Sequence, residues 1–231
     1  MFNKKNITLE AYAPVGDLID IFPIEKSESS YPSWYKNLPK GYNDNNVRNC
    51  TGIRDLFGEG FMIPSWGEYQ ITIHPDGESV VESPVQLRWG HSSKHNISTE
   101  APGAWPGYVN IKLHNPWWFW CPKPIKWLMI QPTWAQQDPQ EYTIVPGVTE
   151  FRYNNQANIN TIWKVKEYSY TVKISAGDML AQIIPITEEK IGLELKVLTD
   201  EIYGQKFAPW MHSFRFGYQK LRAIMEKRNR Q

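Results

Sequence analysis

The strongest constraint on the fold is a series of short segments in which apolar and polar residues alternate. The clearest is 168–175, where a period of two would bury one face of an extended strand and leave the other in water. The series is interrupted by 17 prolines and 15 glycines. The pattern predicts a mainly β chain folded as an antiparallel β-sandwich or jelly roll. The remaining strands are expected at 69–74, 85–89, 109–113, 126–131, 141–145, 158–165 and 193–198.

A tight turn is expected directly after the clearest strand. Residues 176–178 read Ala-Gly-Asp, and glycine readily supplies the positive φ that hairpin turns need. The following segment, 179–186, is again apolar enough to form a strand. The sequence therefore predicts a β-hairpin between 168–175 and 179–186.

Helix is expected at two places. A short helix is predicted near 51–57, with Thr51 as its cap and Gly58 as its stop. The range 212–228 predicts a C-terminal amphipathic helix, because apolar residues recur there at spacings of three and four. These residues are Phe214, Tyr218, Leu221 and Met225.

The rest of the architecture is predicted to be a single domain spanning 1–231. Within it, 24–48 is expected to be an irregular strap on the surface, held down by apolar side chains. Those side chains are Tyr31, Trp34, Tyr35 and Leu38.

Composition excludes several classes of protein. Because 25 basic residues face 24 acidic ones, the chain lacks the excess positive charge behind most nucleic-acid binding. It has neither the apolar run of about 20 residues that a membrane helix needs nor the apolar segment of a secretory signal. Cys50 and Cys121, the only two cysteines, support neither a disulfide framework nor a four-cysteine zinc site. We expect an intracellular protein without membrane or nucleic-acid partners.

Five of the 11 tryptophans lie between Trp117 and Trp134. An exposed row of Trp117, Trp118 and Trp120 could stack on sugars, which would make the chain a glycan-binding module. Core packing or a subunit interface uses the same residues and is the favoured interpretation. In an extended segment, Trp117 and Trp118 must point to opposite sides.

Histidines give the only pattern that resembles a metal site. His91, His95 and His114, with Glu100, would suit a cupin-like metal-dependent oxygenase. The spacing of four between His91 and His95 does not match a strand, on which ligands at i and i+2 share a face. Polar surface histidines are the favoured interpretation.

His74 and Asp76 offer a second pattern, which with His212 would match the iron ligands of oxygenases that use 2-oxoglutarate. Pro75 and Gly77 favour a turn at the end of a strand instead. Neither a nucleophile elbow around a serine nor a phosphate-binding glycine loop is present. The sequence thus predicts no cofactor and no catalytic residue, and it favours a non-enzymatic role while leaving enzymatic activity open.

Six motifs spread over most of the chain resemble an uncharacterised family of proteins from tailed phages, notably those that infect cyanobacteria, and from bacteria. They are DLIDIFPI at 17–24, PSWYKNLP at 32–39, GFMIPSW at 60–66, NPW at 115–117, VPGV at 145–148 and GDMLAQIIP at 177–185. The resemblance implies a phage origin and a mostly β fold, and it transfers no activity.

Together these observations predict a virion component or assembly factor. It would present aromatic surface to other protein subunits, either copies of itself or neighbours in the virion. Its place would be the host cytoplasm during infection, the virion, or both. The cupin-like oxygenase and the glycan-binding module remain the alternatives.

Overall fold

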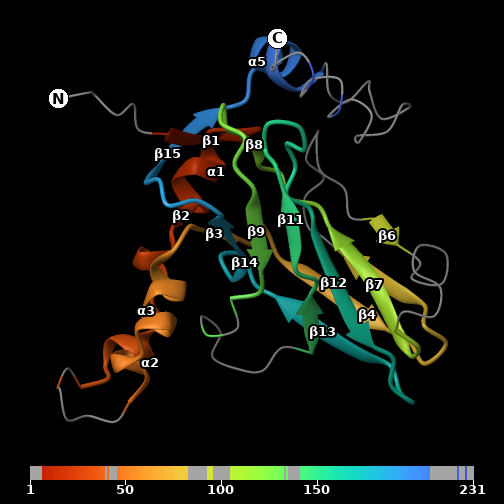
Figure 1. Ribbon diagram of the computed structural model, residues 1–231. Coiled ribbons are helices and arrows are strands. Elements are labelled where there is room, and N and C mark those ends of the chain that lie inside the picture. The colour runs from red at the N-terminus through yellow and green to blue at the C-terminus, as the bar shows by residue number, and fades with distance from the viewer. Residues whose placement is uncertain are drawn as a thin grey trace, which may run out of the picture.

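The computed structural model describes residues 7–39, 41, 46–82, 93–95, 105–132, 134, 141–208, 223 and 227, with 93–95 described by its backbone alone. The chain forms several small, mostly antiparallel sheets around a shared apolar core, and only a few short helices join them (Figure 1). This mainly β, sandwich-like architecture confirms the predicted fold class. None of the helices in the described ranges is long and apolar enough to cross a bilayer.

The strands of the described ranges are β1 (Ile7–Ala13), β2 (Glu25–Lys26), β3 (Phe61–Pro64), β4 (Tyr69–Ile73), β5 (Ser79–Glu82), β6 (Ser93–His95), β7 (Tyr108–Leu113), β8 (Trp118–Trp120), β9 (Trp127–Ile130), β10 (Tyr142–Ile144), β11 (Gly147–Thr149), β12 (Ile159–Lys164), β13 (Tyr170–Ile174), β14 (Met179–Pro185) and β15 (Ile191–Val197). The helical turns are α1 (Asp17–Ile21), η1 (Ser27–Ser30), α2 (Ser33–Lys36), η2 (Val47–Asn49), α3 (Thr51–Gly58), α5 (Asp200–Ile202) and the π-helical η4 (Tyr203–Phe207).

The described residues form four sheets, which we name A, B, C and D. Sheet A has the order β15-β1-β8, sheet B β11-β9-β14-β3-β2, sheet C β13-β4-β5 and sheet D β10-β12-β7-β6. All neighbouring strands are antiparallel except β1 and β15, which pair in parallel over seven residues each. The N-terminal strand of the described chain therefore lies beside its last strand.

Sheets B and C are joined by two antiparallel chain segments. Each runs from one sheet into the other, and both turn at the same corner. On one side β3 passes through Ser65 into β4, and on the other β13 passes through a turn into β14. The Ser65 amide donates to the Asp178 carbonyl at 2.7 Å, and the Gly177 amide donates to the Ser65 carbonyl at 2.8 Å. The two segments thus stay paired while they turn the corner.

This corner overturns the predicted hairpin. The turn itself is correct, because Gly177 has φ +88° and the Ser175 amide donates to the Asp178 carboxylate at 2.7 Å. The flanking strands, however, do not pair with each other. β13 pairs with β4, and β14 pairs with β3 and β9. The turn residues bond to Ser65 rather than closing a two-stranded ladder, so the chain leaves one sheet for another there.

The core is filled by aromatic side chains on the alternating positions of these strands. Trp117, Trp127 and Trp163 are each 0% exposed. Phe119 of β8 and Phe151, in the turn after β11, stack with ring centroids 4.7 Å apart. Large rings of this kind account for much of the apolar area that a small sandwich can bury.

Most of the predicted strands are confirmed within one to three residues of the expected ends, and 85–89 lies outside the described residues. The short helix is confirmed as α3, but the proposed cap is wrong. Cys50 occupies the N-cap position without a side-chain hydrogen bond, Thr51 is the first helical residue and Gly58 is the last. Of the predicted C-terminal helix at 212–228, only Ala223 and Lys227 are described, and both are helical.

Candidate functional site

The tryptophans proposed as a stacking row lie inside the protein. Trp117 is 0% and Trp118 2% exposed, and Trp120 is half-buried. As expected for β8, neighbouring rings point to opposite sides. Trp117 belongs to the main core, whereas Trp118 contacts Phe207 of η4 at a centroid distance of 5.1 Å. Trp117 and Trp118 therefore offer no open face to a sugar in this chain, and Trp118 packs η4 against sheet A.

The three histidines proposed as metal ligands are only partly described. His91 lies outside the described residues, and His95 is known by its backbone, which pairs with Asn110. His114 follows β7, and its carbonyl accepts the Trp66 indole N–H at 3.3 Å. Within the described ranges, no group of three metal-binding side chains comes together.

His74 and Asp76 form the turn between β4 and β5. The Gly77 amide donates to the His74 carbonyl at 3.0 Å, and the Asp76 carboxylate accepts the Glu78 amide at 2.9 Å. The His74 ring bonds to the Ser169 hydroxyl at 2.9 Å. Both side chains are thus engaged within the turn and its neighbouring strand, as the turn interpretation expects. His212 lies outside the described residues.

The densest group of charged side chains lies where η4 meets sheet A. The Glu10 carboxylate accepts hydrogen bonds from Lys206, from the Tyr12 hydroxyl and, at 3.1 Å, from Lys196. The Lys206 ammonium also lies 4.1 Å from the centre of the Trp120 ring. Because each group is paired with another member, this network joins η4 to β1 and β15 rather than exposing a free acid or base.

Stability should fall in acid because of this network. Burial acts to raise the pKa of Glu10, but the hydrogen bonds from Lys206, Tyr12 and Lys196 outweigh it and lower the pKa below the ordinary glutamate value. Such a carboxylate stabilises the folded state above its unfolded pKa of about 4.3, and this contribution is lost as the pH falls through the folded value. We expect Glu10→Gln to lower the free energy of unfolding by about 1–3 kcal/mol at pH 7.

Urea unfolding at several pH values measures this effect. The difference between the two proteins should shrink towards zero as the pH falls through the lowered pKa of Glu10, because both side chains are neutral below it. A difference that stays constant as the pH is lowered until the proteins unfold in acid would show that charge on Glu10 is not what joins η4 to sheet A.

The outer face of sheet B is the main apolar surface of the described chain. Trp127 points into the core, and Met129 also packs against it, so Leu128 between them points outward. Cross-strand register places Val148 of β11 and Ile184 of β14 on either side of Leu128. This row and its neighbours form what we call the sheet-B face. Its residues are Leu128, Ile130, Val148, Ile184 and Ile186.

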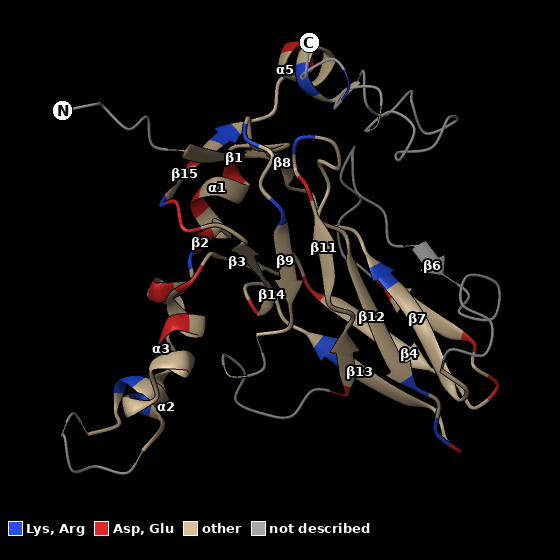
Figure 2. Ribbon diagram, in the orientation of Figure 1, with Lys and Arg blue, Asp and Glu red and all other residues tan. Residues whose placement is uncertain are grey.

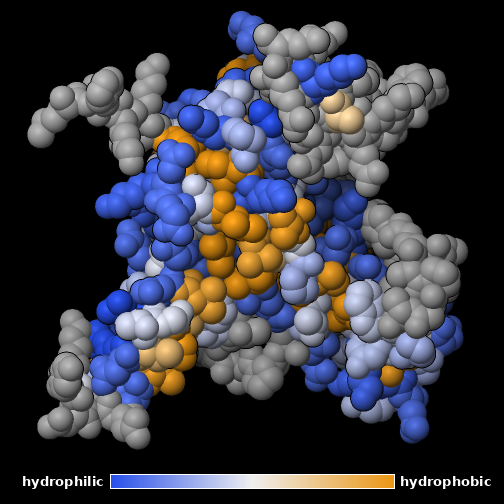
Figure 3. Space-filling view, in the orientation of Figure 1, coloured by the Kyte–Doolittle hydropathy of each residue, from blue (hydrophilic) through white to orange (hydrophobic). Residues whose placement is uncertain are grey.

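The sheet-B face is open to solvent. Val148 is 60% and Ile186 55% exposed, and Figure 3 shows a continuous hydrophobic area over β9, β11 and β14. None of these three strands carries a charged residue, so the same region is uniformly tan in Figure 2. Exposed apolar surface that spans several strands is typical of a docking site for another protein.

A helical arm, 27–59, borders this face and projects from the sandwich (Figure 1). Gln182 of β14 attaches it, because its side-chain amide donates to the carbonyls of Leu56 and Glu59 at 2.7 and 2.6 Å. These carbonyls lie at the end of α3, where intrahelical donors are missing. Gln182 therefore caps α3 and fixes the base of the arm on sheet B.

An aromatic cluster holds the arm together. Phe57 of α3 is 4% exposed, and it contacts Tyr35 at a centroid distance of 4.9 Å and Trp134 at 4.8 Å. The indole N–H of Trp34 donates to the Trp134 carbonyl at 3.1 Å. Three of the four residues expected to hold down this segment, Tyr31, Trp34 and Tyr35, make ring contacts here. Nothing in the sequence indicated that Phe57 would be the ring that these three contact.

Comparison with known proteins places no constraint on these surfaces. No protein-family model matches the chain, and no curated protein is similar to it. The resemblance to a phage family stays a prediction.

Proposed function

We propose that the protein is a non-enzymatic structural or assembly component, and that its sheet-B face docks on a second copy of the same chain. The observation that carries this proposal is the apolar row across three strands, in which exposed Val148 lies beside half-buried Leu128 and Ile184. Burying such a row against another apolar surface is favourable by about 25 cal/mol per Å² of apolar area removed from water.

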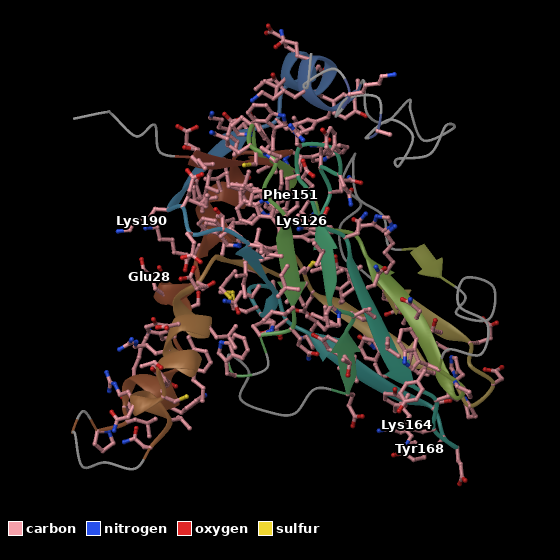
Figure 4. The ribbon with its side chains drawn as sticks, in the orientation of Figure 1. Glu28, Lys126, Phe151, Lys164, Tyr168 and Lys190 are labelled. Carbon is pink, nitrogen blue, oxygen red and sulfur yellow. The ribbon has the colours of Figure 1, made fainter. Side chains whose placement is uncertain are left out.

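A second copy is the partner that the chemistry of the face fits best. An apolar row without charges is complementary to itself, which is the requirement for a two-fold interface. Exposed side chains of both signs border it, so a rotated copy could match opposite charges. They are Lys126 at the start of β9 and Glu188, Glu189 and Lys190 in the loop between β14 and β15; Figure 4 labels the two lysines.

Sedimentation equilibrium tests the docking. We expect the natural protein to form dimers within about 1 to 100 µM, and Val148→Glu to be monomeric over that range, because each copy would have to desolvate a carboxylate at the interface. Circular dichroism and the melting temperature at low concentration should stay close to those of the natural protein, since residue 148 is 60% exposed.

Val80→Glu is the matched control. Val80 is 48% exposed on β5, outside sheet B, so this variant should still form dimers. A natural protein that is monomeric throughout, or a Val148→Glu variant that still dimerises, would contradict docking through the sheet-B face.

The phage setting rests on the resemblance alone and needs its own experiment. We expect quantitative mass spectrometry to find the chain in many copies in purified particles, or in assembly intermediates, of a phage that encodes it. Absence from both would reject the structural role. A monomeric protein that is nevertheless abundant in particles would remove self-docking and keep that role.

A further inference from the structure

The helical arm contains a pocket that the proposed docking does not use. It has a volume of about 770 Å³ and lies between α2, η2 and α3. This volume is in the range of sites for small molecules, which is about 300–1,000 Å³. Every charged residue that lines it is cationic. The lining residues are Tyr31, Tyr35, Lys36, Gly41, Arg48, Asn49 and Arg54.

Two of the three cations are not neutralised by an acidic side chain among the described residues. Lys36 and Arg48 form no ion pair with a described residue. Arg54 pairs with its neighbour Asp55 at 3.3 Å, but both side chains are more than half exposed. Among the described residues that line the pocket, together with Asp55, three cations and one carboxylate give a net charge of +2. Figure 2 shows this cationic character at the α2 end of the arm.

Arg48 is held in position by the backbone. Its Nη1 group donates to the carbonyls of Lys36, at 3.0 Å, and Leu38. The guanidinium carbon lies 5.9 Å from the centre of the Tyr35 ring. These contacts occupy one edge of the guanidinium group and leave Nε and Nη2 without a partner among the described residues. A fixed guanidinium fork of this kind is the usual group for binding an oxyanion.

The Tyr35 hydroxyl points independently to a ligand. Tyr35 is only 3% exposed and lines the pocket, and its hydroxyl has no hydrogen-bond partner among the described residues. A buried hydroxyl without a partner is unusual, because burial removes the water that would otherwise bond to it. Tyr31 lines the same wall, and its phenol is a hydrogen-bond donor at neutral pH. An acceptor oxygen in the pocket would satisfy these donors.

We propose that this pocket binds a phosphate-bearing small molecule of about nucleotide size. Arg48 and Lys36 would bind the phosphate oxygens, Tyr35 would donate its hydroxyl to one of them, and the net charge of +2 would match a phosphate dianion. The proposal is independent of the sheet-B face, because none of the lining residues belongs to sheet B.

Isothermal titration calorimetry with pyrophosphate, ADP and adenosine tests the site. We expect pyrophosphate and ADP to bind with dissociation constants below about 1 mM, and adenosine not to bind, because only the first two carry phosphate. The affinity should fall as the salt concentration rises, since the interaction is between charges.

Two substitutions separate binding from folding. Tyr35→Phe removes only the hydroxyl without a partner, so the melting temperature should not fall while affinity for ADP drops about 5- to 10-fold. Lys36→Gln removes a cation that makes no ion pair with a described residue, and a loss of similar size is expected. Lys173→Gln, whose lysine pairs with Glu68 at 2.7 Å on the distant sheet C, is the charge-matched control and should bind ADP normally.

Several outcomes would overturn the proposal. They are no heat from pyrophosphate or ADP up to about 10 mM, unchanged affinity in both Tyr35→Phe and Lys36→Gln, or equal binding of citrate, which would reveal a general anion site. Preference for a single-stranded oligonucleotide over ADP at equal phosphate concentration would assign the pocket to a nucleic-acid backbone instead. Dimerisation of the protein bears on none of these results.

Discussion

Replacing Trp117 by alanine should lower the free energy of unfolding by about 3–5 kcal/mol. The ring is 0% exposed, and its indole nitrogen has no hydrogen-bond partner among the described residues, so the substitution leaves none of their polar groups unpaired. The loss comes from the apolar area and from the cavity that the rigid neighbouring rings cannot fill. Chemical denaturation followed by far-ultraviolet circular dichroism measures it.

Trp105→Ala is the control for this experiment. Trp105 is 41% exposed in the turn before β7, and its removal should change stability by less than about 0.5 kcal/mol. If Trp117→Ala cost as little as Trp105→Ala, the ring would not be part of a packed core. A stacking role for 117–120 would then regain support.

Gly60→Ala should be at least as damaging, at about 3–5 kcal/mol or complete loss of folding. Gly60 has φ +74°, and a Cβ atom there would lie 2.0 Å from the Ile183 carbonyl oxygen of β14. Neither backbone segment can move easily, because the Gly60 carbonyl also accepts the Ser27 amide at 3.0 Å. Thermal unfolding of the purified variant, or its recovery as inclusion bodies, reports the result.

Gly107→Ala is the control that measures backbone strain without a steric clash. Gly107 has a similar φ of +78°, but no atom lies within 4 Å of the position its Cβ would take. It should therefore cost only the strain of the left-handed conformation, about 1 kcal/mol. A Gly60→Ala variant no less stable than Gly107→Ala would show that β14 does not approach the backbone so closely.

Strands in which buried and more exposed residues alternate were the easiest to predict from the sequence. In β4, β7 and β12 buried residues alternate with more exposed ones, and the period of two is visible in the printed sequence. All four residues of β3 are buried. A strand with both faces covered shows no alternation, so the period of two could not reveal β3.

The pairing of the strands could not be predicted from the sequence, for a different reason. The turn at Gly177 was recognised from local chemistry, but the partner of β13 is β4, whose Thr72 lies 99 residues from Thr171 on the opposite strand. Local turn preference cannot distinguish a hairpin from a corner at which the chain changes sheet. Only the register with β3 and β4 decides between them.

The candidate site was predictable only in part. The interpretation of the tryptophans as core residues agrees with their burial, and so does the expectation that Trp117 and Trp118 point to opposite sides. The pocket gave no sequence signal, because Lys36, Arg48 and Arg54 stand far apart among ordinary polar residues. The sheet-B face could not be predicted either, because only the strand register places Val148 and Ile184 on the same face.

The parallel pairing of β1 with β15 has a consequence for how the chain is made. Glu10 and Lys196 bond to each other across 186 residues, so the N-terminal strand leaves the ribosome long before its neighbour is synthesised. Until then β1 exposes an edge that can pair with other nascent chains. Final closure of the sheet must wait for translation to reach β15, which makes premature termination before that point a direct route to aggregation.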